Sequence, residues 1–183
     1  MRVERLEIED VLLIKPEVFG DDRGYFFESF NKKAFSEVAT GNIEFVQDNQ
    51  SMSKRHVLRG MHYQLPPFAQ GKLVRCVDGE IFDVAVDIRK ASSSFGSWVG
   101  RKLSGANQKQ LWIPPGFAHG FLTLSDRAIV AYKTTEFYDA NSESSISYAD
   151  QSIGIKWPEQ ATPILSKKDS CAPLLSEAPV FDR

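Results

Sequence analysis

The sequence predicts an all-β fold, a sandwich or barrel of roughly nine or ten short strands in one domain. Short apolar or aromatic runs separated by turn residues recur along the chain. The middle of the chain has no long segment with the 3.6-residue period of an amphipathic helix. Internal repeats and low-complexity tracts are absent from the sequence as well. These observations indicate one domain over residues 1–183.

The predicted strands are rich in β-branched or aromatic residues and are bounded by Gly, Pro, Asn or Asp. For example, an aromatic run begins directly after the turn-like Gly20-Asp21-Asp22. In chain order the strands are expected at residues 11–14, 24–30, 43–47, 57–64, 73–77, 80–88, 98–103, 110–113, 120–124 and 129–138.

Helical structure is expected only in short pieces that flank the strands. Asn31 is suited to cap a short helix over residues 32–39. From Trp157 onward the chain is rich in proline, which favours an irregular segment that wraps the body.

The dipeptide Asp78-Gly79 is a strong signal for a hairpin turn. Pairing the flanking strands across this turn puts Leu73, Phe82 and Val84 on an apolar face that resembles core. The opposite face is mixed and carries Lys72, Val74, Cys76, Ile81, Asp83, Ala85 and Asp87. This mixed face suits either the wall of a polar pocket or a solvent-facing surface with a weak ion pair.

The composition is that of one ordinary globular domain. Of the 183 residues, 42% are hydrophobic and 25% are charged, and the formal net charge is −2. Without a basic stripe, a nucleic-acid polymer is not an expected partner. The N-terminus lacks an apolar signal core and no stretch approaches a membrane span, so we expect a cytoplasmic protein with no membrane partner. The two cysteines, Cys76 and Cys171, are expected to be a buried thiol and a bystander.

The three histidines are too few to predict a metal centre. Residues 114–120 have the P-x-G-x-x-H form of the second cupin motif, which ends in His119. Metal-binding cupins pair it with H-x-H, but here that place reads His62-Tyr63-Gln64. Because His56 lies in a predicted loop, too few ligands remain for a stable divalent ion. We therefore expect no metal and chemistry carried by side chains.

His62 is then the candidate general base, because the unperturbed pKa of histidine lies near neutral pH. Lys72 can stabilise an oxyanion and Tyr132 can donate a proton. Such a set suits proton removal beside a carbonyl and return from the other side. Strict alternation puts Arg59 and His62 on opposite faces of their strand, so Gly60 must mark a bulge if both line one pocket.

Long stretches of this sequence resemble those of the dTDP-4-dehydrorhamnose 3,5-epimerases, the nucleotide-sugar epimerases of L-rhamnose synthesis. The matching stretches run in the same order over nearly the whole chain: residues 19–28, 45–49, 57–64, 70–75, 82–89, 112–121 and 166–169. The resemblance implies a jelly-roll, cupin-like fold, a homodimer, a dTDP-sugar substrate and no cofactor.

The resemblance also implies roles for individual residues. His62 matches the proton acceptor of the family, Tyr132 the proton donor, and Lys72 the lysine near the keto oxygen. Asp169 matches the carboxylate that pairs with the base, with Asp83 as a rival partner. Further matches to substrate-contacting positions are Arg23, Phe26, Glu28, Gln47, Asp48, Asn49, Arg59, His119, Tyr138, Glu143 and Lys168. Arg23 and Arg59 would bind the diphosphate, and Phe26 and Tyr138 would stack on thymine or pack beside it. A competing interpretation of Phe26 is an aromatic residue of the core.

The implied reaction is epimerisation of dTDP-4-dehydro-6-deoxy-D-glucose at carbons 3 and 5. Alternatives are a single-centre epimerase or keto-isomerase on a related dTDP-sugar, a non-catalytic sugar-binding cupin and a metal-dependent cupin. The presence of Tyr132 favours double epimerisation, because relatives that lack this tyrosine isomerise instead. Whether Arg23 and Glu28 reach the pocket of a partner subunit is left open by the sequence.

Overall fold

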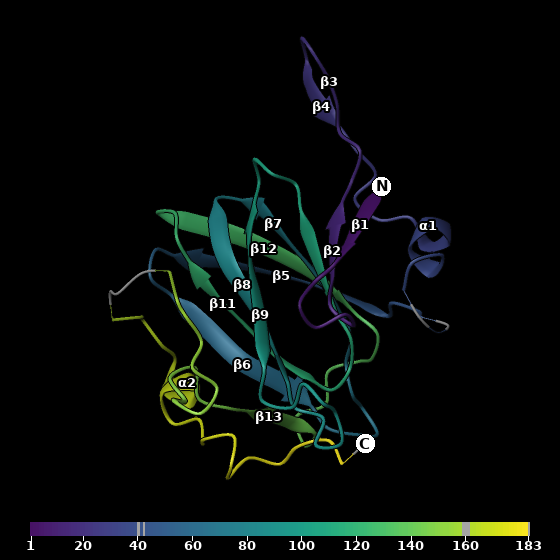
Figure 1. Cartoon of the computed structure of the whole chain (residues 1–183). Coiled ribbons are helices and arrows are strands. Elements are labelled where there is room, and N and C mark those ends of the chain that lie inside the picture. Colours follow the sequence, from purple (N-terminus) through teal and green to yellow (C-terminus); the bar gives the residue numbers. More distant parts are fainter. Residues whose placement is uncertain (40, 42, 159–161, 183) are drawn as a thin grey trace.

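The computed structural model describes residues 1–39, 41, 43–158 and 162–182 (Figure 1). The described residues form mainly antiparallel strands with two short helices, so the predicted all-β class is confirmed. The elements are β1 (Arg2–Arg5), β2 (Leu12–Lys15), β3 (Phe19–Asp21), β4 (Gly24–Phe26), α1 (Lys32–Ser36), β5 (Gln47–Lys54), β6 (Leu58–Gln64), β7 (Lys72–Asp78), β8 (Glu80–Asp87), β9 (Trp98–Ser104), β10 (Gln110–Ile113), β11 (Phe117–Thr123), β12 (Arg127–Thr134), β13 (Glu143–Ser145) and α2 (Lys167–Ser170).

Two sheets make up the body of the molecule. The six-stranded sheet has the order β1-β2-β10-β7-β12-β5, and the five-stranded sheet has the order β13-β6-β11-β8-β9. Strands that are neighbours in the sequence often lie in opposite sheets, so the chain crosses repeatedly between them. This crossing brings β6 of one sheet and β7 and β12 of the other to one interior.

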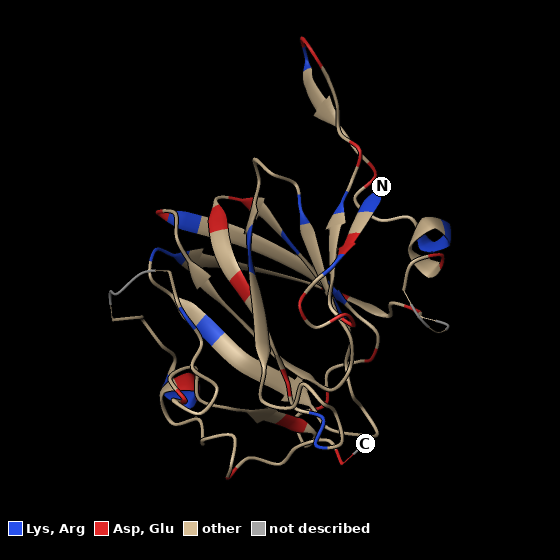
Figure 2. Ribbon diagram, viewed as in Figure 1, with Lys and Arg blue, Asp and Glu red and all other residues tan. Residues whose placement is uncertain are grey.

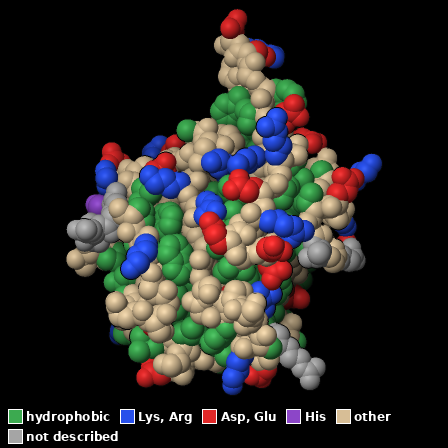
Figure 3. Space-filling model, in the orientation of Figure 1, with side chains coloured by type: hydrophobic (Ala, Val, Ile, Leu, Met, Phe, Trp, Pro, Cys, Tyr) green, Lys and Arg blue, Asp and Glu red, His purple; other side chains and the backbone are tan. Residues whose placement is uncertain are grey.

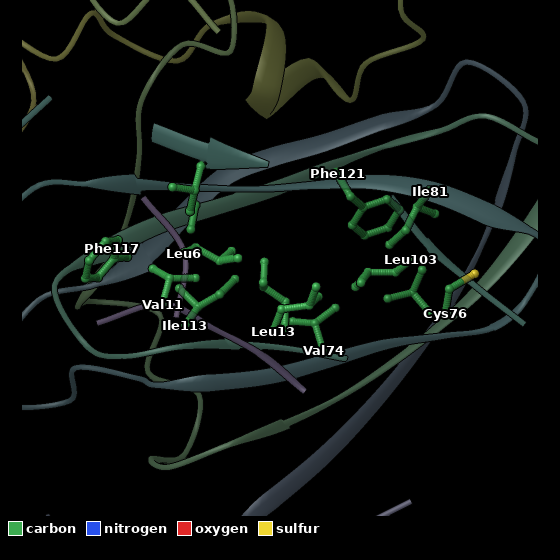
Figure 4. Close-up of a cluster of buried hydrophobic side chains, with 14 of the residues drawn as sticks. Leu6, Val11, Leu13, Val74, Cys76, Ile81, Leu103, Ile113, Phe117 and Phe121 are labelled. Carbon is green, nitrogen blue, oxygen red and sulfur yellow. The ribbon is translucent and has the colours of Figure 1, made fainter. Parts of the chain in front are cut away.

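The interior between the sheets is apolar over most of its length. Figure 4 shows Leu13 and Val74 of the six-stranded sheet facing Ile81, Leu103 and Phe121 of the five-stranded sheet. All five side chains are buried. Burial of this apolar surface is the main stabilising contribution to the fold.

Parts of the outer faces of both sheets are also covered. On the six-stranded sheet, Phe35 of α1 packs on Trp112 with the ring centroids 5.2 Å apart. On the five-stranded sheet, Val84 and Val86 pack with the C-terminal segment, which confirms that the tail wraps the body. Asn31 caps α1 as predicted, because its side chain accepts a hydrogen bond from the backbone N–H of Ala34 at 3.1 Å.

The predicted hairpin across Asp78-Gly79 is wrong. β7 pairs with β10 and β12, whereas β8 pairs with β11 and β9, so the turn connects two sheets instead of two paired strands. Gly79 is required in this turn, since it has φ +80° and an added Cβ would lie 2.1 Å from the carbonyl oxygen of Arg127. The division of residues between the two faces of these strands is correct. The mixed face, however, lines the interior between the sheets, and the apolar face packs on the outer side.

The strand prediction missed the polar strands. The segment predicted at 43–47 precedes the actual strand β5, whose sequence is almost entirely polar. The short elements β1, β3, β13 and α2 were also missed. β5 is an edge strand in which half-buried and exposed residues alternate, so one face meets the interior without an apolar pattern.

The hairpin of β3 and β4 projects from the body as an arm, and hydrophobic side chains gather where it meets the body (Figures 1 and 3). Phe19, Tyr25 and Phe26 are 58%, 60% and 68% exposed. Contiguous apolar patches on a protein surface are a common feature of contact sites for other molecules.

Charged residues of both signs are interspersed over the described chain (Figure 2). Within the described residues, neither helix has the length and apolar character of a membrane-spanning segment.

Candidate active site

A cavity of about 160 Å³ opens between the two sheets at one end of the interior. Its walls come from β5, β7 and β12 on one side and from β6 and β13 on the other. The lining residues are Gln47, Asn49, His62, Tyr63, Gln64, Gln70, Lys72, Tyr132, Tyr138 and Glu143. Seven of these ten are among the site residues proposed from the sequence.

His62 of β6 is held against the cavity wall by a carboxylate. Its Nε2 lies 2.5 Å from Oδ1 of Asp169, whose side chain is 4% exposed. Burial lowers the pKa of His62 below its usual value, while the hydrogen bond and charge of Asp169 oppose this and Lys72 and Lys168 add to it. A neutral imidazole with a carboxylate behind it is suited to accept a proton.

Lys72 of β7 enters the cavity from the opposite sheet. Its Nζ donates a hydrogen bond to the carbonyl oxygen of His62 at 3.1 Å, so the two residues are neighbours. Burial lowers the pKa of Lys72 to about 8, although the negative charges of Asp83 and Glu143 act to raise it. A buried ammonium group beside a general base can stabilise an oxyanion that forms there.

Tyr132 of β12 also lines the cavity from the six-stranded sheet. Burial raises the pKa of its phenol above the usual value; the nearby charge of Arg59 opposes this shift and that of Glu143 adds to it. The phenol therefore stays protonated at neutral pH, as a proton donor must.

An ion pair at the cavity wall links β13 to the helix that carries Asp169. Lys168 Nζ lies 2.5 Å from Oε2 of Glu143, and the hydroxyl of Tyr138 donates to the same oxygen at 2.9 Å. Although burial raises the pKa of Glu143, the hydrogen bonds from Lys168 and Tyr138 lower it overall. Glu143 thus contributes a negative charge to this wall.

His119 lies beside His62 on the neighbouring strand β11, where the two residues are register partners. Its Nε2 is 2.7 Å from Oδ1 of Asp83, and both side chains are buried. Asp83 is therefore the partner of His119, and Asp169 is the partner of His62. His119 is not among the residues that line the cavity.

The side chains of Arg59 and His62 lie on the same face of β6, because the strand contains a bulge. Between the pairs Phe121–Arg59 and His119–His62 the register shifts by one residue, as the sequence required. Gly60 has φ +143°, and an added Cβ would lie 2.5 Å from the Cα of Gly120. The Nε of Arg59 donates to Ser53 Oγ at 2.9 Å, which directs the guanidinium across to β5.

The three proposed residues of β5 divide between the two faces of that strand. Gln47 and Asn49 line the cavity, and Gln47 Nε2 donates to Asn49 Oδ1 at 2.8 Å. Asp48 instead points to the outer face, where it pairs with Lys133 at 2.8 Å. Within one chain, therefore, Asp48 does not line the cavity, since alternation along the strand turns its side chain away.

The arm residues also lie outside the cavity of their own chain. Arg23 pairs with Asp21 at the arm, and Phe26 and Glu28 line a separate hollow of about 310 Å³ with apolar residues of α1 and β2. This hollow is larger than the cavity but holds none of the proposed proton-transfer groups. The structure of a single chain does not bring the arm residues to His62.

Three residues of the cavity wall were missed by the sequence analysis: Tyr63, Gln64 and Gln70. Gln64 donates to the carbonyl oxygen of Phe137 at 3.1 Å and accepts from the N–H of Asp139 at 2.9 Å, so it fixes the loop that carries Tyr138. Its position two residues after His62 on one strand was the available signal.

Comparison with known proteins decides the family to which this site belongs. A family model described as dTDP-4-dehydrorhamnose 3,5-epimerase matches residues 5–177. The chain belongs to the dTDP-4-dehydrorhamnose 3,5-epimerase family. The predicted family and enzyme class are thereby confirmed.

Individual relatives of this epimerase agree with the family match. A dTDP-4-dehydrorhamnose 3,5-epimerase of Shigella flexneri is 60% identical over 92% of this chain and 93% of its own. A dTDP-6-deoxy-D-glucose-3,5-epimerase of Legionella pneumophila Philadelphia 1, solved with dTDP-4-keto-L-rhamnose, superimposes with a TM-score of 0.94 at 46% identity. That match covers 100% of this chain and 99% of the other, and it confirms the cupin-like fold.

A more distant relative of the epimerase is named for epimerisation at one carbon. A dTDP-4-dehydrorhamnose 3-epimerase of Streptomyces niveus is 38% identical over 97% of this chain and 86% of its own. The same fold thus occurs in relatives named for one centre and in relatives named for two.

Proposed function

We propose that this epimerase inverts carbons 3 and 5 of dTDP-4-dehydro-6-deoxy-D-glucose and so produces dTDP-4-dehydro-L-rhamnose. The ketone at carbon 4 acidifies the protons on both flanking carbons. The observation that carries the proposal is the position of His62 on one sheet and Tyr132 on the other, with the cavity between them. Inversion of a carbon needs a base on one side of the sugar ring and an acid on the other.

Each inversion then takes two proton transfers. His62 removes the proton beside the ketone, and the electron pair of the broken C–H bond moves to the carbonyl oxygen as an enolate. The ammonium group of Lys72 stabilises that negative charge. Tyr132 donates its proton to the opposite face of the carbon, and proton exchange with water restores both residues.

The nucleotide would be bound mainly outside this cavity. At about 160 Å³ the cavity is smaller than the ~300–1,000 Å³ of typical small-molecule sites. Its size suits the sugar ring, with Arg59 placed at the adjoining end of β6 for the diphosphate. We propose that the arm of a second subunit supplies Arg23, Phe26 and Glu28 to complete the nucleotide site.

Deuterium incorporation tests the number of centres inverted. In deuterated water with catalytic amounts of enzyme, we expect product with deuterium at carbons 3 and 5, because each new C–H bond takes its hydrogen from Tyr132 in equilibrium with solvent. NMR spectroscopy of the product locates the label. Label at carbon 3 alone would make this chain a 3-epimerase like its relative from Streptomyces niveus.

The low pKa of Lys72 predicts an alkaline limb in the pH profile. Lysine is charged below its pKa, so kcat/KM is expected to fall as the pH rises through about 8 and the ammonium group is lost. Tyr132 cannot cause this limb, because burial raises its pKa above the usual value. In Lys72→Met the remaining activity should lack the limb between pH 7 and 9. An unchanged limb in that variant would assign it to another group.

The arm can be tested by complementation between two defective chains. Arg23→Ala should raise KM about tenfold or more, because a charge-assisted contact to phosphate is lost. In a mixed dimer of Arg23→Ala and His62→Ala chains, an arm that acts on its partner leaves one complete site. At low substrate we therefore expect about half of the wild-type activity.

If the arm acts within its own chain, the mixed dimer should have low activity. If Arg23 served the site of its own chain, both sites of the mixed dimer would remain defective. Tagging the two chains differently allows the mixed dimer to be isolated before the assay. Activity no higher than the mean of the two parent dimers would therefore rule out arm exchange.

A further inference from the structure

Asp169 is carried by a helix of a single turn, α2, whose first residues hold it in place. Ser166 occupies the N-cap position, and its hydroxyl oxygen accepts a hydrogen bond from the backbone N–H of Asp169 at 3.1 Å. The side chain of Ser166 therefore acts directly on the backbone of the residue that contacts His62.

The sequence Ser166-Lys167-Lys168-Asp169 has the spacing of a capping box. In such a box the acidic residue usually returns a hydrogen bond to the N–H of the capping residue. Here the carboxylate of Asp169 lies on Nε2 of His62 at 2.5 Å. The capping geometry is thus used to aim a carboxylate at the proposed base.

α2 is held mainly by contacts of its side chains and of the residues at its ends. A helix of four residues is not stable by itself, so its position depends on contacts at its ends. Leu165 packs against the apolar cluster around Leu58, and Lys168 pairs with Glu143. These contacts anchor the segment, whereas the hydrogen bond from Asp169 to Ser166 sets the backbone from which the carboxylate projects.

We propose that Ser166 is a positioning residue for proton transfer: its hydroxyl holds Asp169 so that the carboxylate stays on His62. This inference rests on the proposed role of His62 as the base. Ser166 itself is exposed and does not line the cavity.

The charges around His62 give this role a measurable signature. The groups that face it are Asp169 and Lys168 of α2, Lys72 of β7 and Glu143 of β13. Asp169 raises the pKa of His62, and both lysines lower it. When the carboxylate is displaced, the acidic limb of kcat/KM should therefore move to lower pH.

Ser166→Ala tests the proposal, with Ser170→Ala as a matched control. Ser170 lies in the same helix, and its hydroxyl donates to the carbonyl oxygen of Lys167 at 2.9 Å. In Ser166→Ala we expect kcat/KM to fall about five- to tenfold, in line with the loss of an N-cap, with the acidic limb at lower pH. Ser166→Thr, which keeps the hydroxyl, and Ser170→Ala should both retain the wild-type profile.

A double-mutant cycle separates positioning from simple loss of stability. If Ser166 acts through Asp169, adding Ser166→Ala to Asp169→Asn should produce no further loss in kcat/KM. If the loss in kcat/KM of the double variant equalled the product of the two single losses, the proposal would be overturned. A wild-type pH profile in Ser166→Ala would overturn it as well. Neither outcome would affect the role of His62, which is decided by the His62→Ala variant alone.

Discussion

Replacing His62 by alanine is expected to lower kcat by about 10³-fold or more, because the proposed general base for the inversions at carbons 3 and 5 is lost. Deuterium exchange from solvent into the sugar should disappear together with epimerisation, since both begin with the same proton removal. The affinity for dTDP should stay within about threefold of wild type, because His62 lines the cavity that we propose for the sugar, and the nucleotide is proposed to bind mainly outside it. Exchange followed by NMR and dTDP binding by calorimetry measure the two effects.

The control for this variant is another histidine that lies away from the cavity. His56 is in the turn before β6 with φ +63°, a conformation that asparagine tolerates well. His56→Asn should therefore retain wild-type exchange. If His62→Ala still exchanged the protons beside the ketone at the wild-type rate, another group would be the base. Loss of dTDP binding together with activity would instead indicate a damaged fold.

The sequence predicted the region of the site better than the sheet pairing around it. The bulge at Gly60 could be inferred because Arg59 and His62 were both wanted in one pocket, and the register shift on β6 confirms it. The pairing of β7 with β8 was wrong, because a turn signal specifies a local reversal of the chain. Which sheet each strand joins depends on contacts distant in sequence.

Two parts of the site lacked a local signal altogether. β5 is polar because one face meets the cavity and the other meets solvent, so its strand character is hidden from apolar patterning. Asp169 lies 107 residues after His62, in a single helical turn of the C-terminal segment. Periodicity cannot join such residues, and only the resemblance to the epimerase family proposed their contact.

Tyr132→Phe is expected to separate proton removal from inversion. His62 and Lys72 remain in this variant, so the enolate still forms, but the phenol that is proposed to return the proton is lost. Formation of the epimer should fall about 10²- to 10⁴-fold, the usual contribution of a positioned acid. His62 can return a solvent-derived proton to the face from which it removed one. Recovered substrate should therefore gain deuterium without inversion.

The ratio of label in recovered substrate to epimer formed is the decisive measurement, because simple unfolding lowers both together. Tyr148→Phe provides the control, since Tyr148 packs against Trp157 away from the cavity and should leave the ratio unchanged. An unchanged rate of epimer formation in Tyr132→Phe would mean that a different group returns the proton. Loss of inversion at only one carbon would assign Tyr132 to that carbon, and the second inversion would then need its own acid on the same side of the ring.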